Sequence, residues 1–192
     1  MRETDAVLQE LRDGNERYVR LRSGLRPGPG CEAMPAHRPH AVVVGCSDAR
    51  VPVEQVFDQG RGSLFVVRVA GHVLESAALA SILYAVRELD VRLVIVLGHQ
   101  ACGAVRAALA GISDEALRPL VDPISARLAL GSAEVGTTED QAICANARAA
   151  ADEVSVFLRA TDPERAAHVS VYCAVKALDT GEVTWLNREE TA

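Results

Sequence analysis

The sequence predicts an α/β fold: a mostly parallel central sheet of about four parallel strands plus an antiparallel C-terminal edge strand, flanked by helices, with an N-terminal helical arm. Short β-branched runs alternate along the chain with segments whose apolar residues recur at helical spacing. Residues 91–98 contain an unbroken apolar run, which is typical of a strand buried on both faces of a parallel sheet. Near the C-terminus, ALDTGEVTWL has the turn residues of a hairpin, so we expect the last strand to be antiparallel.

The first 40 residues are predicted to form the helical arm and a connector. Residues 4–21 place apolar side chains among charged ones at loosely helical spacing, with an interruption around Gly14. Residues 23–40 contain RPGPG and further prolines, which break regular structure, so we expect an extended connector. The α/β core then covers residues 41–192. The chain of 192 residues is short for two domains, and we therefore expect one.

The core is predicted to contain strands and helices in alternation. Runs rich in β-branched residues and bounded by glycine predict strands, and apolar residues on one helical stripe predict helices. Residues 112–138 are variable in character, and we assign no element to them. The predicted elements are, in order, strands at 41–45 and 64–70, a helix at 74–89, a strand at 91–98, helices at 101–111 and about 139–160, and strands at 168–175 and 183–186. This alternation predicts helices on both faces of the sheet.

The composition excludes several classes of function. A formal net charge of −6 argues against a nucleic-acid surface, which needs clustered lysine and arginine. No apolar run approaches the ~20 residues that span a bilayer and no signal peptide is evident, so we expect no membrane partner and a soluble, cytoplasmic protein.

The five cysteines are an odd number at irregular spacings, which is a poor disulfide framework. Cys144 and Cys173 fit buried apolar positions, and Cys31 fits a loop.

Two of the predicted strands end in residues that can bind a metal. GCSDAR (45–50) supplies Cys46, and GHQACG (98–103) supplies His99 and Cys102. Ligands of open parallel sheets lie beyond the carboxyl ends of the strands, so these side chains can converge if the two strands are neighbours. Two thiolates and one imidazole are ligands typical of zinc. When protein residues fill only three positions, the fourth is left for a water whose pKa the ion lowers to about 7.

Asp48 and Arg50 decide whether that fourth position is open. A free Asp48 could occupy it and give a structural, non-catalytic zinc centre. Arg50, two residues further along an extended segment, can point the same way and hold the carboxylate away from the ion. We therefore predict that the pair forms a gate. A redox role for Cys46 and Cys102 is the weaker alternative, because they do not form a C-x-x-C motif.

These motifs resemble the β-class carbonic anhydrases. CSDARVP, FDQGRGSLFVVRVAGHV and VLGHQACGAV are similar to the family over about 41–110, LRDGNERYV to its opening helix, and DTGEV to its C-terminal hairpin. The resemblance implies a single β-carbonic-anhydrase-like domain over 1–192 that converts CO2 and water to bicarbonate and a proton through a zinc-bound hydroxide. It also implies a homodimer or a dimer-of-dimers tetramer, with pockets at the subunit boundary.

The resemblance also implies a role for individual residues. The zinc ligands would be Cys46, His99 and Cys102. The catalytic dyad would be Asp48 and Arg50, with Asp48 on the zinc in a closed state only. We assign the substrate pocket to His37, Phe65 and Gly103.

The chain departs from the usual family pattern outside the ligands and the dyad. His37 stands where a glutamine that hydrogen-bonds bicarbonate is common, and the charge of a histidine changes near neutral pH. The other departures are Leu83, Gln100, Ala101 and Lys176. They leave open whether the substrate is CO2 or another small heterocumulene, COS or CS2, that the same chemistry would hydrolyse. For His72, which follows RVAG, two roles remain open, at the edge of the pocket or packed in the core.

Overall fold

The structure is a computed structural model that describes residue 12, residues 37–130 and residues 138–186. The chain divides into two units, residues 1–36 and 37–192. Arg12, the one described residue of the first unit, is helical, as predicted for residues 4–21. The rest of the predicted arm, most of the connector and Cys31 lie outside the described residues. Within the described part, no helix is long and apolar enough to cross a membrane.

The second unit contains a five-stranded sheet in the order β2-β1-β3-β4-β5. The first four strands are parallel and β5 pairs antiparallel with β4, as the sequence predicts. The strands are β1 (Ala41–Gly45), β2 (Leu64–Arg68), β3 (Leu93–His99), β4 (Ser170–Lys176) and β5 (Val183–Trp185). The prediction of a second strand reaching residue 70 is wrong at its end. The chain leaves the strand after Arg68, and residues 70–72 form the 3-10 turn η1 (Ala70–His72), in which Gly71 and His72 have positive φ.

The helices confirm the predicted alternation and add elements that the sequence did not indicate. The predicted helices correspond to α3 (Ser76–Glu88), α4 (Gly103–Leu109) and α6 (Glu139–Thr161). The additional elements are α2 (Val53–Val56), the 3-10 turn η2 (Glu115–Leu117), α5 (Arg118–Leu130) and α7 (Pro163–Ala166). The helix α5 lies in the segment to which we assigned no element, and Pro123 inside it weakened the helical pattern. The four-residue helices α2 and α7 are too short to show a period.

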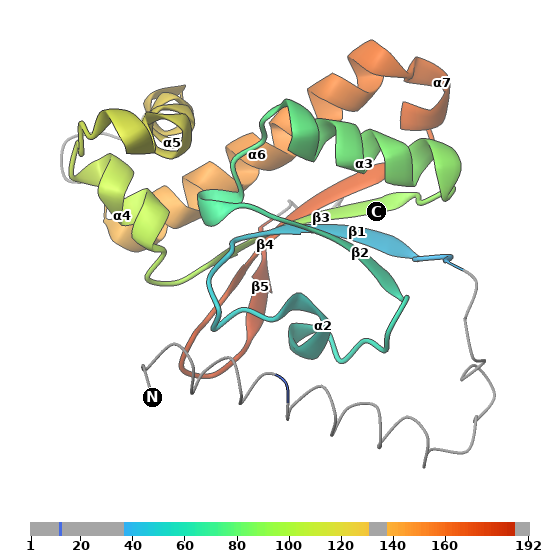
Figure 1. The fold of residues 1–192 in the computed structure, drawn as a ribbon, viewed down its shortest axis with the longest axis horizontal. Helices are drawn as coiled ribbons and strands as arrows, with labels where there is room; N and C mark the ends of the chain where they lie inside the picture. The colour runs from blue at the N-terminus through green and yellow to red at the C-terminus, as the bar shows by residue number, and fades with distance from the viewer. Residues whose placement is uncertain (1–11, 13–36, 131–137, 187–192) are drawn as a thin grey trace. The chain divides into compact units, whose positions relative to one another are not determined.

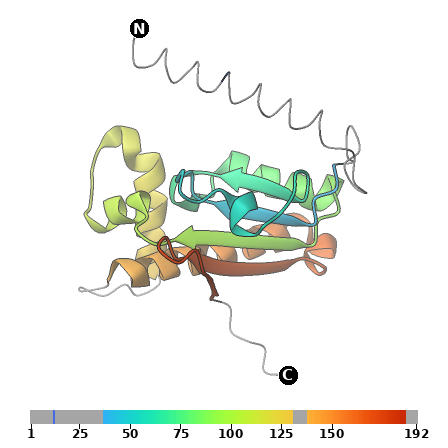
Figure 2. The same cartoon turned by 90° about the horizontal axis from the view of Figure 1, so that it is seen from below.

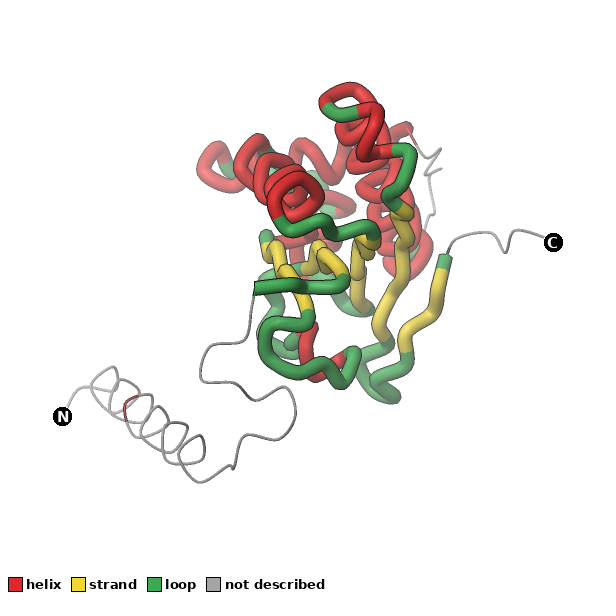
Figure 3. Tube along the Cα trace, turned by 90° about the vertical axis from the view of Figure 1, so that its right-hand side faces the viewer, coloured by secondary structure: helices red, strands yellow, loops and turns green. Residues whose placement is uncertain are grey.

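The helices cover the two faces of the sheet unequally. Figures 1 and 3 show α3 to α7 over one face, and among the described helices only α2 over the other. Side chains alternate along each strand, so Val44 and Val96 join the larger core beneath α3 and α6, while Val43 and Leu97 face the smaller core with Val53 of α2. Helices therefore lie on both faces of the sheet, as predicted, but among the residues described one face carries only the short helix α2.

The register of the sheet brings the two predicted metal motifs to one edge. β1 and β3 are neighbours, and Gly45 pairs with Leu97, so the strands end at nearly the same level. Figure 2 shows β2 and β3 with their arrowheads at the same end of the sheet, near α4. The strands that precede the two motifs are thus neighbours, as the predicted convergence of Cys46, His99 and Cys102 requires.

Candidate metal centre

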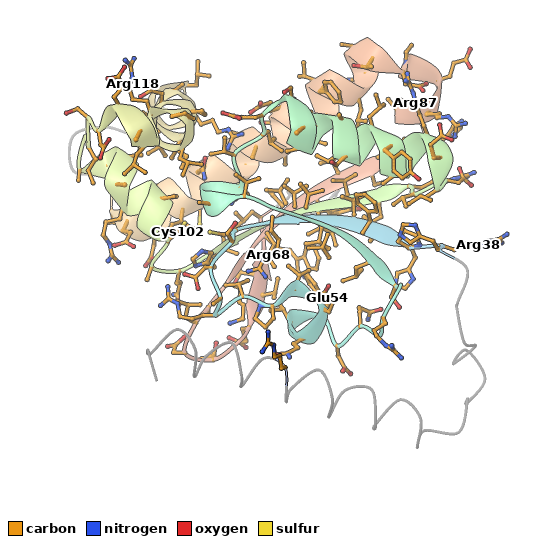
Figure 4. All side chains as sticks on the ribbon, in the orientation of Figure 1. Arg38, Glu54, Arg68, Arg87, Cys102 and Arg118 are labelled. Atoms are coloured by element: carbon orange, nitrogen blue, oxygen red, sulfur yellow. The ribbon has the colours of Figure 1, made fainter. Side chains whose placement is uncertain are left out.

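Cys46, His99 and Cys102 lie together at this edge of the sheet. Cys46 follows β1, His99 is the last residue of β3, and Cys102 precedes α4, at the point labelled in Figure 4. All three are buried, and their ligand atoms lie within 4.8 Å of one another. The residues described by the structure contain no other such cluster. The predicted convergence of sulfur, nitrogen and sulfur is therefore what the fold produces.

The imidazole of His99 is oriented to offer one nitrogen to a metal. Its Nδ1 lies 2.8 Å from the carbonyl oxygen of Gln100, so Nδ1 carries the proton and donates it there. The Nε2 atom is buried and has no hydrogen-bond partner among the residues that the structure describes. A buried polar atom without a partner costs roughly 1–3 kcal/mol, which a bound cation at Nε2 would relieve.

The turn from His99 to Cys102 depends on the two residues between them. Ala101 adopts a positive φ of 52°, which reverses the chain so that Cys102 comes back beside His99. Gln100 fastens this turn to the neighbouring strand: its backbone N–H donates to the Lys176 carbonyl at 3.0 Å, and its Oε1 accepts from the Leu178 N–H at 3.1 Å. The departures at Gln100 and Ala101 therefore fall on residues that shape the ligand turn.

The two cysteines form a pair that favours a cation. The hydrogen bond from the Cys102 thiol lowers the pKa of Cys46, and the same bond, with burial, raises the pKa of Cys102. Burial alone would lower the pKa of His99, but the nearby Cys46 sulfur and the Gln100 carbonyl raise it overall. Cys46 also accepts a hydrogen bond from the Gly71 N–H at 3.3 Å. A thiolate at Cys46 suits zinc, so the donor set of two sulfur atoms and one imidazole nitrogen fits the ion.

Asp48 lies beside the cluster and is held by Arg50. Arg50 donates from Nε to Oδ1 at 3.0 Å and from Nη2 to Oδ2 at 2.7 Å, and its backbone N–H donates to Oδ1 at 2.8 Å. These hydrogen bonds hold the pKa of Asp48 well below its usual range. The Oδ2 atom lies 4.0 Å from His99 Nε2. Of the two arrangements that we considered for Asp48, the structure has the one paired with arginine.

Arg68 is a positioning residue that the sequence reading missed. At the end of β2, its guanidinium donates to the Cys46 carbonyl at 2.8 Å and to the Asp48 carbonyl at 2.6 Å, and Figure 4 labels it. A charged residue that ends the apolar run LFVVR was the available signal. Arg68 thus ties the loop that carries Cys46 and Asp48 to the neighbouring strand.

Replacing Arg68 with methionine should lower the free energy of unfolding by roughly 1–3 kcal/mol, because two backbone carbonyls lose a charged donor. Urea denaturation measures the change. Arg92→Met is the matched control: Arg92 pairs with Asp90 at an exposed position, with side chains 65% and 68% accessible. We expect a change below about 1 kcal/mol for it. Equal effects of the two substitutions would mean that Arg68 does not hold the loop.

The residues assigned to the substrate pocket do not all lie beside the cluster. Phe65 pairs with Val42, three residues before Gly45 and so roughly 10 Å back along the sheet. The His37 ring lies 6.1 Å from the Phe65 ring, which lies 6.3 Å from Tyr84. Gly103, in contrast, directly follows Cys102, and a Cβ added to it would meet nothing within 4 Å.

Three comparisons place the chain among known proteins. The family model for carbonic anhydrase matches residues 41–183. Carbonic anhydrase 2 of Mycobacterium tuberculosis is 44% identical, over 66% of this chain and 65% of that protein, and a carbonic anhydrase of Mycolicibacterium smegmatis has the same identity and coverage. The crystal structure of the β-carbonic anhydrase CafA of Aspergillus fumigatus superimposes with a TM-score of 0.70 at 25% identity, over 98% of this chain and 93% of that one. The match thus spans about two thirds of the length of the two bacterial relatives.

Proposed function

This chain belongs to the β-class carbonic anhydrase family, and from that premise we propose that it catalyses the reversible hydration of CO2 to bicarbonate and a proton at a zinc centre. The observation that carries the proposal is the buried Nε2 of His99, which has no hydrogen-bond partner in the described part of the chain and lies within 4.8 Å of the sulfur atoms of Cys46 and Cys102. These three residues would hold the zinc. A zinc ion held there would lower the pKa of a bound water to about 7 and so would supply the nucleophile at neutral pH.

Asp48 and Arg50 would orient the attacking water. Because the two hydrogen bonds from the Arg50 side chain hold the pKa of Asp48 low, the carboxylate accepts a hydrogen bond without taking the proton. Asp48 is therefore an orienting acceptor, and the proton must leave by another group or by solvent. The alternative of a non-catalytic zinc protein needs Asp48 as a fourth ligand, and its pairing with Arg50 weighs against that role.

The substrate pocket would be completed by a second copy of the chain. Phe65 and His37 lie back along the sheet from the cluster, so within one chain they do not line the space beside Gly103. In a homodimer, or in a dimer of dimers, these residues would come from the neighbouring subunit, as the family resemblance implies. Cys46, Cys102 and Cys144 are free thiols in the part of the chain that the structure describes, which supports a reducing compartment such as the cytoplasm.

Stopped-flow measurement of CO2 hydration with a pH indicator tests the proposal. We expect a rate that rises with pH through the neutral range, is lost when a chelator removes zinc, and returns when zinc is added back. COS and CS2, offered to the same preparation, distinguish the alternative substrates. A protein that binds one zinc per chain and hydrates no CO2 at any pH up to about 9, where a water on zinc is ionised, would contradict the proposal.

A further inference from the structure

A buried polar network lies behind the metal centre and takes no part in the proposed chemistry. Arg127 of α5, Asn146 of α6 and His72 of η1 are 5%, 0% and 1% exposed. Figure 1 shows α5 and α6 on the helix-covered face of the sheet. Most buried polar groups in proteins are hydrogen-bonded, so the partners of these residues indicate what they do. Within this network His72 Nδ1 is buried without a hydrogen-bond partner among the described residues.

Asn146 is held in one orientation by its partners. Its Oδ1 accepts from Arg127 Nη1 at 3.3 Å, so its Nδ2 is the donor, to the Gly71 carbonyl at 3.2 Å and to His72 Nε2 at 2.9 Å. Arg127 is anchored in turn by Glu153, whose Oε2 accepts from Nε at 3.1 Å and from Nη2 at 2.8 Å. The turn at Gly71 and His72 is thus held by the amide of Asn146 from α6 and by the guanidinium of Arg127 from α5, whose Nη1 also donates to the His72 carbonyl at 3.5 Å. His72, for which we considered the pocket edge or the core, is packed in the core.

The turn that this network holds is unfavourable by itself and tightly packed. Gly71 and His72 have φ of 62° and 45°, and the left-handed region is costly for a residue with a Cβ such as His72. A Cβ on Gly71 would lie 2.5 Å from Ile124 Cδ1 and 2.9 Å from Ala104 Cβ, so α5 and α4 close on the turn. In this conformation the Gly71 N–H donates to Cys46 Sγ at 3.3 Å.

We propose that Asn146 and Arg127 are positioning residues of the metal centre: they fix the Gly71–His72 turn so that its amide hydrogen-bonds the sulfur of Cys46, and so set how tightly the centre holds its ion. An N–H donor to a ligand sulfur stabilises the thiolate form that binds metal. Groups that orient metal ligands typically change metal affinity 10- to 100-fold when they are lost. The inference rests on the proposed zinc site but not on the reaction carried out there.

The test measures zinc affinity by chelator competition and hydrogen exchange of the Gly71 amide, in the zinc-bound full chain. Asn146→Asp keeps the size of the side chain and the acceptor for Arg127, but puts an oxygen against the Gly71 carbonyl. We expect a zinc dissociation constant about tenfold higher, faster exchange at Gly71, and a shifted sulfur-to-cobalt absorption band in the cobalt-substituted protein. Asn146→Ala should show the same three changes.

Val154→Ala is the control for a general loss of stability. Val154 is buried on the same helix and has no part in the network, so its truncation loosens the core without changing a donor to the turn. We expect zinc affinity within twofold of the unaltered protein. Folded Asn146 variants with unaltered affinity and unaltered Gly71 exchange would overturn the inference, as would an equal loss of affinity in Val154→Ala. Zinc binding without CO2 hydration in the unaltered protein would instead overturn the proposed function alone, and absence of zinc binding would overturn both.

Discussion

Cys46→Ser should abolish CO2 hydration and leave the chain without bound zinc. Cys46 supplies one of the three donors of the cluster and is the thiol whose pKa its surroundings lower. If an apparent zinc binding energy of about 10–16 kcal/mol is shared among such ligands, losing one costs roughly 3–5 kcal/mol, on the order of 10³ in affinity. Metal analysis after dialysis and stopped-flow hydration measure the two losses.

Cys144→Ser is the matched control for that substitution. Cys144 is also a free cysteine, half-buried on α6, and it is not part of the cluster. We expect it to keep one zinc per chain and the hydration rate of the unaltered protein. Zinc retained at full stoichiometry by Cys46→Ser would show that the ion is held elsewhere, and the assigned ligand set would be wrong.

Arg50→Met should lower CO2 hydration by about 10- to 100-fold while zinc stays bound. Without the guanidinium, Asp48 loses the main cause of its low pKa, which would return towards about 3.9, the usual value for aspartate. Above that pH the carboxylate is still ionised but no longer held, so it is free to take the fourth position on the metal. The loss of activity should therefore persist across the neutral range, and stopped-flow rates between pH 6 and about 9 would show it.

Two further substitutions separate the geometry of Arg50 from its charge. Arg50→Lys keeps the charge but cannot form the two-pronged contact, so we expect an intermediate rate. Arg87→Met removes an arginine whose Nε donates to Asp162 at 2.8 Å, at a site remote from the cluster in Figure 4, and it should leave hydration unchanged. If Asp48 occupies the fourth position on the metal in Arg50→Met, thiocyanate cannot bind there. Thiocyanate should then no longer perturb the spectrum of the cobalt-substituted variant. An unaltered rate and an unaltered thiocyanate response in this variant would show that Arg50 does not control Asp48.

The sheet and the three candidate ligands were predictable because each depends on local sequence. β-branched runs bounded by glycine have few alternatives to strands, and parallel neighbours must end at one edge. Cys46, His99 and Cys102 follow such runs directly, so their convergence needed only the pairing of β1 with β3. The helix α6 was predictable because it is long, amphipathic and begins with a capping box at Thr138.

The parts that escaped prediction depend on contacts between distant residues. The role of Arg68 comes from carbonyls about twenty residues earlier, and that of Asn146 from a turn more than seventy residues earlier. No period or motif encodes such pairs. The end of β2 was misplaced because VVRVAG reads as one extended run, whereas the turn at Gly71 is imposed by the helices packed on it. Phe65 and His37 were assigned to the substrate pocket from the family resemblance, but within a single chain they do not lie beside the cluster.

The ring of His99 is fixed by the carbonyl of Gln100, and the metal centre lies where β1 and β3 end and α4 begins. These elements are held in place by the buried aliphatic core and not by an ion, so the three ligands should already be positioned before zinc binds. Loading and stripping of zinc should then be reversible events on a native scaffold, unlike zinc fingers, whose chains collapse when the ion is withdrawn. The availability of zinc would thus turn the activity on or off without unfolding the protein.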